Sequence, residues 1–441
     1  MRIAIASQTY YPGNNGQAVF TISLAEGLAG LGHQVMVIVP ATPFLAKATV
    51  INGVQVQTVA AIPLAALHPN VHFTPLPGLK IWQLLADFHP DLVHIQDHYP
   101  LCHSVLRTAR LRKLPLIGTN HFLPDNLIRN LAFMASKPEY FKHFLWRWML
   151  DVFNQLDMVV TPTRTAAQIL LRQHIRVPIV PISCGVNTRR FRPLPATDRS
   201  EVRRRYGLDP ARALLMYVGR LDQEKQLDVL LRTMGKLKDT TGQLALIGRG
   251  NHGEALRGLA VELGLGSRVV FTGYAPANDL PALLNSADIF AMPSTAELQS
   301  IATLEAMATA KPVLAADAQA LPELVTNGLN GYLFKPDDAD HAAGRVSQLL
   351  AERDHWAAMG QVSLDRARQH SLGNTLRRHE ELYAALIRIK RPVRHLPLRT
   401  ELARRLHLKP DLSTPKQHLL PLIKFDRGRH ERHPDREGDR Y

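Results

Sequence analysis

The chain is organised around one stretch, Pro293-Ser-Thr-Ala-Glu-Leu-Gln-Ser-Ile-Ala-Thr-Leu-Glu-Ala-Met-Ala-Thr-Ala-Lys-Pro-Val-Leu314. We expect a buried strand over residues 288–292 to end before it, and a helix to begin at Ser300, a favourable N-cap residue. Glu297 then lies in the loop and Glu305 within the helix. A helix N-terminus carries about half a positive charge and free N–H groups, so it suits a phosphate. The stretch therefore predicts a site for a diphosphate with hydroxyl groups at both ends, as in a sugar nucleotide.

Strand-like and helix-like segments alternate on both sides of this stretch. Such alternation predicts a doubly wound parallel sheet, in which ligands bind beyond the carboxyl ends of the strands. Arg220 and Lys225 follow the first of these strand ends, where cations can reach a diphosphate and neutralise its charge. We expect strands at 214–218, 244–247, 269–272 and 312–315, with glycines such as Gly219, Gly248 and Gly273 after them, and helices at 226–238, 251–263, 277–286 and 321–326.

The first half of the chain shows the same alternation. A strand at 2–6 leads into a loop that carries Gly13 and Gly16, although the G-x-G-x-x-G dinucleotide fingerprint is absent. Polar residues stand directly after two later strands: Asp97 and His98 after 92–95, and Asn120 and His121 after 115–119. Two adjacent strand ends with such residues favour a functional reading over a structural one. We expect further strands at 34–39, 53–60, 159–163 and 179–182, and helices at 17–30, 80–88 and 101–112.

Residues 139–156 repeat apolar side chains at the spacing of one helix face, from Phe141 and Phe144 to Leu156. One interpretation is a core helix. The other is an interfacial helix, in which a second face with Trp146 meets lipid, aided by the apolar and basic residues of 127–137. Both can hold in one helix.

Composition limits the class of protein. At 441 residues the chain fits two domains, and the apolar fraction of 46% is ordinary for a globular protein. No apolar run is long enough to span a bilayer, the N-terminus reads as a strand, and two unrelated cysteines favour a reducing cytoplasm. The net charge is +15; residues 388–441 hold 15 Lys and Arg against 7 Asp and Glu, a net +8. Such charge favours an anionic partner.

The prolines at 193 and 195 suit a linker, so we place a domain boundary there. The expected organisation is a first Rossmann-like domain over 1–195 and a second over 196–372. A helix over 373–390 follows and is expected to cross back to the first domain, and 391–441 forms a basic tail.

These residues together resemble the family-4 retaining glycosyltransferases, whose GT-B architecture has two Rossmann-like domains facing across a cleft. The resemblance implies that the domain over 1–195 lies on the acceptor side and that the domain over 196–372 binds the donor nucleotide. Glu297 and Glu305 match the E-x7-E motif of that family. Tyr217-Val-Gly-Arg220 with Glu224-Lys225 matches its phosphate-binding segment, and the resemblance covers residues 1–390. Leu298-Gln-Ser300 stands where the family often has Gly-Phe-Gly, and Asn15 precedes Gly16 where a second glycine is common. In this respect the chain looks like bacterial enzymes that glycosylate diacylglycerol.

The resemblance implies transfer of a hexose, expected to be glucose, from UDP-glucose with retention. Arg220 and Lys225 would stabilise the leaving diphosphate, Glu305 would hold the ribose and Glu297 the hexose, and His121 would contact the sugar. Same-face attack is the expected route, and Glu297 as nucleophile is the alternative. No metal and no tightly bound cofactor are expected. The implied donor site comprises Gly16, Gly219, Arg220, Lys225, Gly248, Tyr274, Glu297, Gln299, Ser300 and Glu305, and the acceptor-side candidates are Asp97, His98, Asn120 and His121.

The acceptor is open at this point. The motif variant, the charge and the 127–156 region favour a lipid acceptor and a peripheral position on the cytoplasmic face of an anionic membrane. The alternatives are a soluble or polysaccharide acceptor, or a sugar-nucleotide epimerase on the same architecture. Charge alone would support a nucleic-acid binder, but the chain has no nucleic-acid motif, so no nucleic acid is expected.

Overall fold

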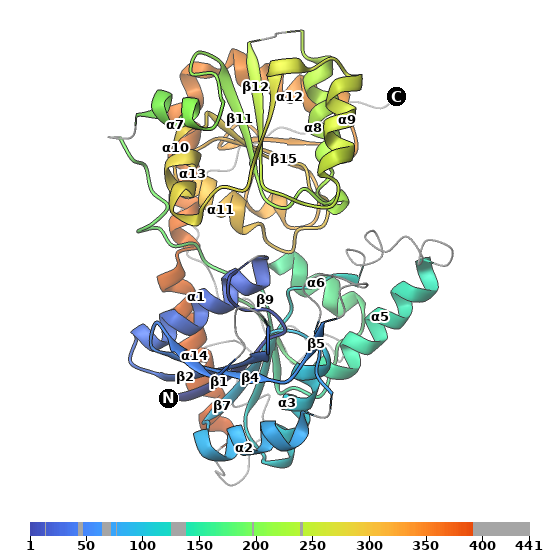
Figure 1. Ribbon diagram of the computed structural model, residues 1–441, viewed down its shortest axis with the longest axis vertical. Coiled ribbons are helices and arrows are strands. Elements are labelled where there is room, and N and C mark those ends of the chain that lie inside the picture. The colour runs from blue at the N-terminus through green and yellow to red at the C-terminus, as the bar shows by residue number, and fades with distance from the viewer. Residues whose placement is uncertain are drawn as a thin grey trace, which may run out of the picture.

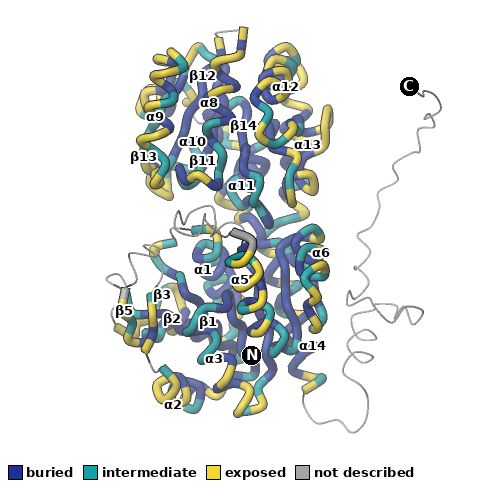
Figure 2. Tube along the Cα trace, turned by 90° about the vertical axis from the view of Figure 1, so that its right-hand side faces the viewer, coloured by how far each residue is buried: buried dark blue, intermediate teal, exposed yellow. Residues whose placement is uncertain are grey.

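Two parallel β-sheets form the frame of the computed structural model, which describes residues 1–13, 15–42, 47–63, 72–75, 77–124, 138–195, 198–238 and 241–390. Figure 1 shows them in two lobes, one above the other, with helices flanking each sheet. In Figure 2 the strands of both lobes are buried between helices whose outer sides are exposed. The predicted pair of Rossmann-like α/β domains with GT-B architecture is confirmed. Pro195 lies between the last strand of the first sheet and the first strand of the second.

The first sheet has the order β10-β9-β8-β7-β1-β2-β4-β3, and all neighbours are parallel except β3 with β4. The strand order reverses beside β1, so the loops after β1 and β7 open into one crevice. The strands are β1 (Arg2–Ala6), β2 (Gln34–Pro40), β3 (Thr49–Ile51), β4 (Val54–Val59), β7 (Leu92–Ile95), β8 (Leu116–Thr119), β9 (Met158–Thr161) and β10 (Ile179–Pro181), with β5 (Ile62–Pro63) and β6 (His72–Phe73) in a separate pair. The helices are α1 (Gly16–Gly30), α2 (Gly78–Phe88), α3 (Pro100–Leu111), α5 (Pro138–Phe153) and α6 (Arg164–Arg172).

The second sheet is parallel throughout, in the order β13-β12-β11-β14-β15-β16. Its order reverses between β11 and β14, which places the loops after these strands at one crevice. The strands are β11 (Ala213–Val218), β12 (Gly242–Ile247), β13 (Val269–Gly273), β14 (Ile289–Met292), β15 (Val313–Ala316) and β16 (Gly331–Phe334). The helices are α7 (Arg199–Arg205), α8 (Leu227–Lys236), α9 (Gly253–Glu262), α10 (Leu280–Ser286), α11 (Ile301–Ala308), α12 (Ala339–Ala351) and α13 (Trp356–Gln369).

Helix α14 (Leu372–Lys390) follows the second domain and packs on the first. In Figure 1 it descends from the upper lobe alongside α1. Its apolar residues Leu376, Leu382 and Leu386 join the buried cluster that contains the strands of the first sheet. The Tyr383 hydroxyl lies 2.6 Å from Nδ1 of buried His94. The last helix therefore joins the two domains by burying its apolar face in the domain where the chain began.

Some predicted helices are wrong in extent. Residues 321–326 form only a single 3-10 turn, Leu321–Glu323, since Pro322 is tolerated only in a first turn and the chain turns again at 327. The helix expected over 277–286 begins as a 3-10 turn, and α10 starts at Leu280. Helices α7, α12 and α13 were not predicted.

Helix α5 combines the two interpretations of its apolar pattern, but on different faces from those expected. Trp146 is 5% exposed and belongs to the core of the first domain, so the prediction that it faces lipid is wrong. The exposed aromatic residues are instead Tyr140 (71%) and Phe144 (56%), near the start of the helix. The apolar and basic residues of 127–137, and the tail 391–441, lie outside the described residues. None of the helices in the described ranges is long and apolar enough to cross a bilayer.

Candidate functional site

The ends of β11 and β12 meet so closely that glycine is required. Gly248 has a φ of +139°, and a Cβ atom placed there would lie 1.9 Å from the carbonyl oxygen of Gly219. No side chain fits at that distance without moving one of the two backbones. The two strand ends therefore form one glycine-lined edge, and the backbone there is open to a ligand.

A cluster of opposite charges follows these strand ends. Lys225, on a 3-10 turn, places Nζ 2.8 Å from Oε1 of Glu297 and 3.4 Å from Oε1 of Glu224. Burial is the largest influence on the pKa of Lys225 and lowers it, but the carboxylates of Glu297 and Glu224 together outweigh burial and raise the pKa above its usual range. Burial raises the pKa of Glu297, and Lys225 then holds it below its usual range. Both partners are therefore charged at neutral pH.

Arg220 adds a second cation to this cluster. Its guanidinium pairs with the carboxylates of Asp222 and Glu224. Its side chain is 34% exposed, so it reaches solvent while it is paired. The two cations are thus held together by neighbouring carboxylates, in positions where an incoming diphosphate could take over part of the pairing.

Helix α11 presents its N-terminus to the same region. Ser300 is the N-cap, as predicted, and its Oγ accepts hydrogen bonds from Thr303 N at 3.3 Å and Thr303 Oγ1 at 2.8 Å. The eight-residue helix begins immediately after Glu297-Leu-Gln, so the charged cluster adjoins its positive end. The arrangement favours negative charge at this helix terminus.

Glu305 lies one turn into α11 and has no hydrogen-bond or ion-pair partner for its carboxyl group among the described residues. Burial raises the pKa of Glu305 to about 7, and Arg190 opposes this shift. Removing a carboxyl group from water without a hydrogen-bond partner is costly, and hydroxyl groups of a ligand would compensate this half-buried one. The position agrees with a role in holding a diol.

The segment between the two glutamates is fastened to the first domain. Thr163 Oγ1 donates to the Leu298 carbonyl at 2.8 Å, and the Leu298 side chain joins the buried cluster of the first domain. Oε1 of Gln299 accepts from Cys184 N at 2.7 Å and from Ser183 Oγ at 3.1 Å. Gln299 therefore holds the interdomain segment with its oxygen, and its buried Nε2 has no hydrogen-bond partner among the residues that the structure describes.

The first domain reaches this site through the N-terminus of α1. Asn15 caps the helix by accepting from Ala18 N at 2.9 Å. A Cβ atom on Gly16 would lie 4.0 Å from Cδ1 of Ile301, the first residue of α11. The starts of α1 and α11 therefore lie against each other, and both glycine and N-cap signals in the sequence pointed to this place.

His121 packs against helix α1. Its ring packs on Phe20 with centroids 4.8 Å apart, and Nε2 lies 3.0 Å from Oε1 of Gln96. Burial lowers the pKa of His121 to about 3, with a contribution from His379. The imidazole is neutral, and since the Gln96 oxygen accepts, Nε2 carries the proton. His121 can therefore orient a ligand by hydrogen bonding but is a weak base.

The other acceptor-side candidates are buried. Asp97 accepts from Gln8 N at 2.7 Å, Gln17 Nε2 at 2.8 Å and Tyr99 N at 3.1 Å, so it ties the loop after β1 to the end of β7. The His98 ring is packed among aromatic rings, and burial lowers its pKa to about 3.

Asn120 is also buried, and its Oδ1 accepts from Phe122 N at 3.2 Å. Asp97, His98 and Asn120 therefore shape the first domain from inside, and of the four acceptor-side candidates only His121 is partly exposed. Tyr274, after β13, is exposed at the donor edge.

Arg190 and Thr163 are site residues that were not predicted. The charge of Arg190 acts on Glu305, and Thr163 anchors the loop between the glutamates. Thr163 was recognisable only as a helix cap, and Arg190 only as part of a basic linker. In the described part of the chain no group of three or more His, Cys, Asp and Glu residues is arranged to hold a metal ion.

Comparison with known proteins identifies two family models along the chain. The model of Glycosyltransferase Family 4 matches residues 14–190, and that of Glycosyl transferases group 1 matches residues 198–364. The chain is 31% identical over 379 residues to the D-inositol 3-phosphate glycosyltransferase of Mycolicibacterium smegmatis, covering 82% of this chain and 84% of that protein. It is 26% identical over 319 residues to the sulfoquinovosyl transferase SQD2 of Arabidopsis thaliana, covering 70% of this chain and 59% of that protein.

A solved structure, that of Anabaena HepE in complex with UDP-glucose, is similar in fold. It has a TM-score of 0.70 and 21% sequence identity, and the match covers 87% of this chain and 99% of that one. The two matched family models divide where the two sheets divide.

Proposed function

The chain belongs to the family-4 glycosyltransferases, and from this we propose that it moves glucose from UDP-glucose to a membrane lipid such as diacylglycerol, with retention at the anomeric carbon. The observation that carries the proposal is the Lys225–Glu297 pair, 2.8 Å apart, beside Arg220 and the N-terminus of α11. Glu305, one turn further, has no hydrogen-bond or ion-pair partner among the described residues. Cations, a helix terminus and two acidic groups on either side match a diphosphate between a hexose and a ribose. The UDP-glucose bound by HepE supports this donor.

The transfer then follows from these groups. The diphosphate takes hydrogen bonds from Arg220, Lys225 and the free N–H groups of α11, which stabilise its charge as the bond from the anomeric carbon to the phosphate oxygen breaks. The acceptor hydroxyl attacks the anomeric carbon on the same face, and its proton passes to the departing phosphate oxygen. Glu297 orients the hexose hydroxyls. Glu297 is already bonded to Lys225, which supports an orienting role over that of a nucleophile.

The lipid acceptor is supported by α5. Exposed Tyr140 and Phe144 stand beside exposed His143 and Arg147, so aromatic and basic side chains share one projecting helix (Figure 1). Aromatic rings with basic neighbours suit the interface of an anionic membrane. The net charge of +15 acts in the same direction. We propose peripheral attachment to the cytoplasmic face.

A second acceptor class is favoured by a separate observation. The relatives that are 30% or 31% identical are named as D-inositol 3-phosphate glycosyltransferases, whose named acceptor is a small phosphorylated polyol. Product analysis separates the two. The full chain is incubated with labelled UDP-glucose and either diacylglycerol in phosphatidylglycerol vesicles, D-inositol 3-phosphate, or no acceptor, and products are identified by mass and by NMR of the anomeric linkage.

An α-linked glucosyl lipid from the vesicle reaction is the expected result. Transfer to the inositol phosphate alone replaces the lipid by the soluble acceptor. An inverted linkage contradicts retention, and conversion of the donor without any acceptor indicates an epimerase. Trapping a glycosyl–Glu297 adduct would overturn the same-face route.

Membrane attachment has its own test. Burying two aromatic side chains contributes a few kcal/mol, so Tyr140→Ser with Phe144→Ser should weaken sedimentation with anionic vesicles at least about tenfold. Val261→Ser, which removes an exposed apolar side chain from α9 in the other domain, should have no effect. No sedimentation of the unaltered chain at low salt, or equal binding by both variants, contradicts the role of α5.

A further inference from the structure

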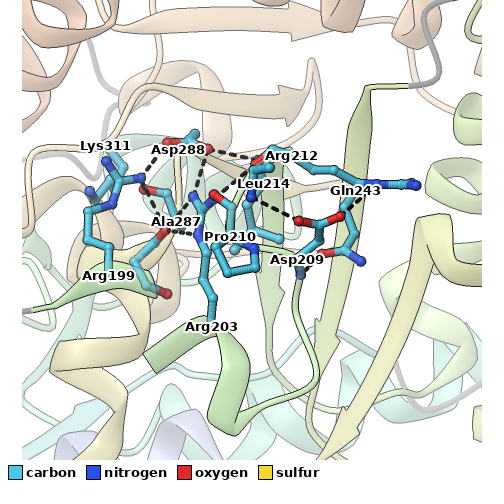
Figure 3. A network of polar contacts seen from close by, with 12 residues as sticks. Arg199, Arg203, Asp209, Pro210, Arg212, Leu214, Gln243, Ala287, Asp288 and Lys311 are labelled. Carbon is cyan, nitrogen blue, oxygen red and sulfur yellow. Dashed lines mark hydrogen bonds and ion pairs between the residues drawn. The ribbon is translucent and has the colours of Figure 1, made fainter. Parts of the chain in front are cut away.

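A basic pocket lies in the second domain at the amino ends of β11 and β14, the edge of the sheet opposite the proposed donor site. It is a cavity of about 330 Å³, and the residues that define it here are Arg199, Arg203, Arg212, Arg353, Asp288 and Trp356. Figure 3 shows Arg199 and Arg203 at Asp288, while the Arg212 side chain extends toward Asp209. The lining therefore contains four guanidinium groups and one carboxylate.

Arg203 forms the fixed floor of the basic pocket. Its buried guanidinium donates to the carbonyl oxygens of Ser286 (2.7 and 2.9 Å), Pro210 (3.1 Å) and Arg212 (2.9 Å), and to Asp288 at 2.8 Å. Asp288 also accepts from Leu214 N at 2.8 Å. These bonds connect the loop before β11 to the start of β14, so the position of the pocket is set by backbone atoms.

The other arginines have donors to spare. Arg199 makes all its bonds in this network through Nη2, including one to Asp288, and its side chain is 48% exposed. Arg212 donates to Asp209 through Nε at 3.2 Å, while its Nη1 is buried and has no hydrogen-bond partner in the described part of the chain. Arg353 is exposed; its Nη2 donates to Thr241 Oγ1 at 3.3 Å, and its guanidinium carbon lies 5.8 Å from the centre of the Trp356 ring. Asp288 is already paired with the guanidinium groups of Arg199 and Arg203, so it cannot neutralise the charges of the other two arginines of the pocket.

The surroundings are also positive. Lys311 lies to the left of Asp288 in Figure 3, close to Arg199, and its Nζ donates to the Asn285 carbonyl at 2.8 Å. Burial, together with Arg199, lowers the pKa of Lys311 to about 8. Trp356 closes one side of the pocket with a partly buried ring, held by a 2.8 Å bond from Nε1 to the Leu349 carbonyl. The pocket therefore offers convergent cationic donors beside a flat apolar wall.

We propose that the basic pocket binds a multivalent phosphate-containing anion, of the class of pyrophosphate or a phosphorylated sugar. The free guanidinium edges of Arg199, Arg212 and Arg353 would hold the phosphate oxygens, since the planar fork of arginine matches their geometry. Ser200 at the rim supplies a hydroxyl group, and Trp356 packs against the remainder of the ligand. This site is separate from the donor cleft and does not depend on the transfer reaction.

Pyrophosphate binding measured by calorimetry on the full chain tests the proposal. The donor cleft is weakened in all samples by Lys225→Met, so that binding in the second site is seen by itself. Adding Arg212→Gln and Arg353→Gln should reduce the affinity at least about tenfold, because each removes a charge-assisted hydrogen bond. The matched control Arg232→Gln, at an exposed arginine of α8 that does not line the pocket, should leave it unchanged.

Arg203 is left intact because its loss would disturb the fold, and thermal melting confirms that the variants are folded. The proposal is overturned if the Lys225→Met protein shows no saturable binding at millimolar pyrophosphate. It is equally overturned if the pocket variant binds as tightly as its parent, or if Arg232→Gln causes the same loss, which would indicate general attraction to a basic protein.

Discussion

The carboxyl group of Glu305 should make the stability of the second domain depend on pH. Its pKa in the folded chain is about 7, against an ordinary value of 4.5, because the side chain is partly buried in α11 and has no hydrogen-bond or ion-pair partner among the described residues. Between these values the folded state holds a proton that the unfolded state has lost, so stability falls as pH rises and the loss is complete above pH 7. At 1.36 kcal/mol per pKa unit the full cost is about 3 kcal/mol.

Water screens part of this cost, because Glu305 is partly exposed, and we expect about 1–2 kcal/mol. Glu305→Gln removes the titration and keeps the shape of the side chain. The variant should therefore gain stability relative to the natural chain as pH rises from 5 to 8.5. Since 1 kcal/mol shifts the melting temperature of a domain of this size by 2–4 °C, the relative gain should be about 4 °C.

Differential scanning fluorimetry of both proteins at pH 5 and 8.5, without donor, measures this difference. Glu254→Gln, at a 96% exposed glutamate of α9, is the matched control and should show no pH-dependent gain. The reasoning fails if the melting temperatures of Glu305→Gln and the natural chain differ equally at both pH values. It also fails if the melting temperature of the variant falls relative to that of the natural chain as pH rises.

Three further outcomes follow from the contacts of the site. Lys225→Met should lower kcat about 100-fold or more, because it removes a cation from the leaving diphosphate. Lys236→Met, at an exposed position, should leave kcat unchanged. An active Lys225→Met enzyme contradicts the phosphate role. Gln299→Leu leaves the Cys184 N–H buried and unpaired, so it should lower the free energy of unfolding by about 1–3 kcal/mol in denaturant melts. Gln299→Glu keeps an acceptor oxygen and should lower that free energy less. Equal losses in the two variants would contradict the role of the oxygen. Gly248→Ala should lower the free energy of unfolding by at least about 3 kcal/mol or prevent folding, because its Cβ would lie 1.9 Å from a carbonyl oxygen. Gly258→Ala in α9, where a Cβ has nothing within 4 Å, should be neutral or stabilising. A well-folded Gly248→Ala protein contradicts the close approach.

The positions of the donor-side residues were largely predictable from the sequence. Ser300 as N-cap, Gly219 and Gly248 at strand ends, and the eight-residue interval from Glu297 to Glu305 are each set by a few neighbouring residues. The alternation of strands and helices then places these loops at one edge of the sheet, because parallel strands have their carboxyl ends at the same edge. The pairing of Lys225 with Glu297, 72 residues apart, follows from that shared edge.

The residues that lie between the domains were not predictable in the same way. Leu298 and Gln299 looked like variants of a donor loop, yet one is buried in the first domain and the other holds the segment leading out of it. Trp146 was expected at a lipid surface and lies in the core. Asp97 and His98 stand at a strand end, as functional residues do, but point into the first domain.

By itself, the sequence determined the two α/β domains, the edge at which the donor side lies and the identities of its charged groups, because strand alternation, glycine turns and helix caps depend on local spacing. Only the tertiary structure decided which of these side chains reach the cleft. Burial and pairing depend on what another segment, often more than a hundred residues away, places beside each group. Thr163 and Cys184 lie beside the loop of the two glutamates, whereas the carboxyl group of Glu305 has the charge of Arg190 nearby but no hydrogen-bond or ion-pair partner among the described residues.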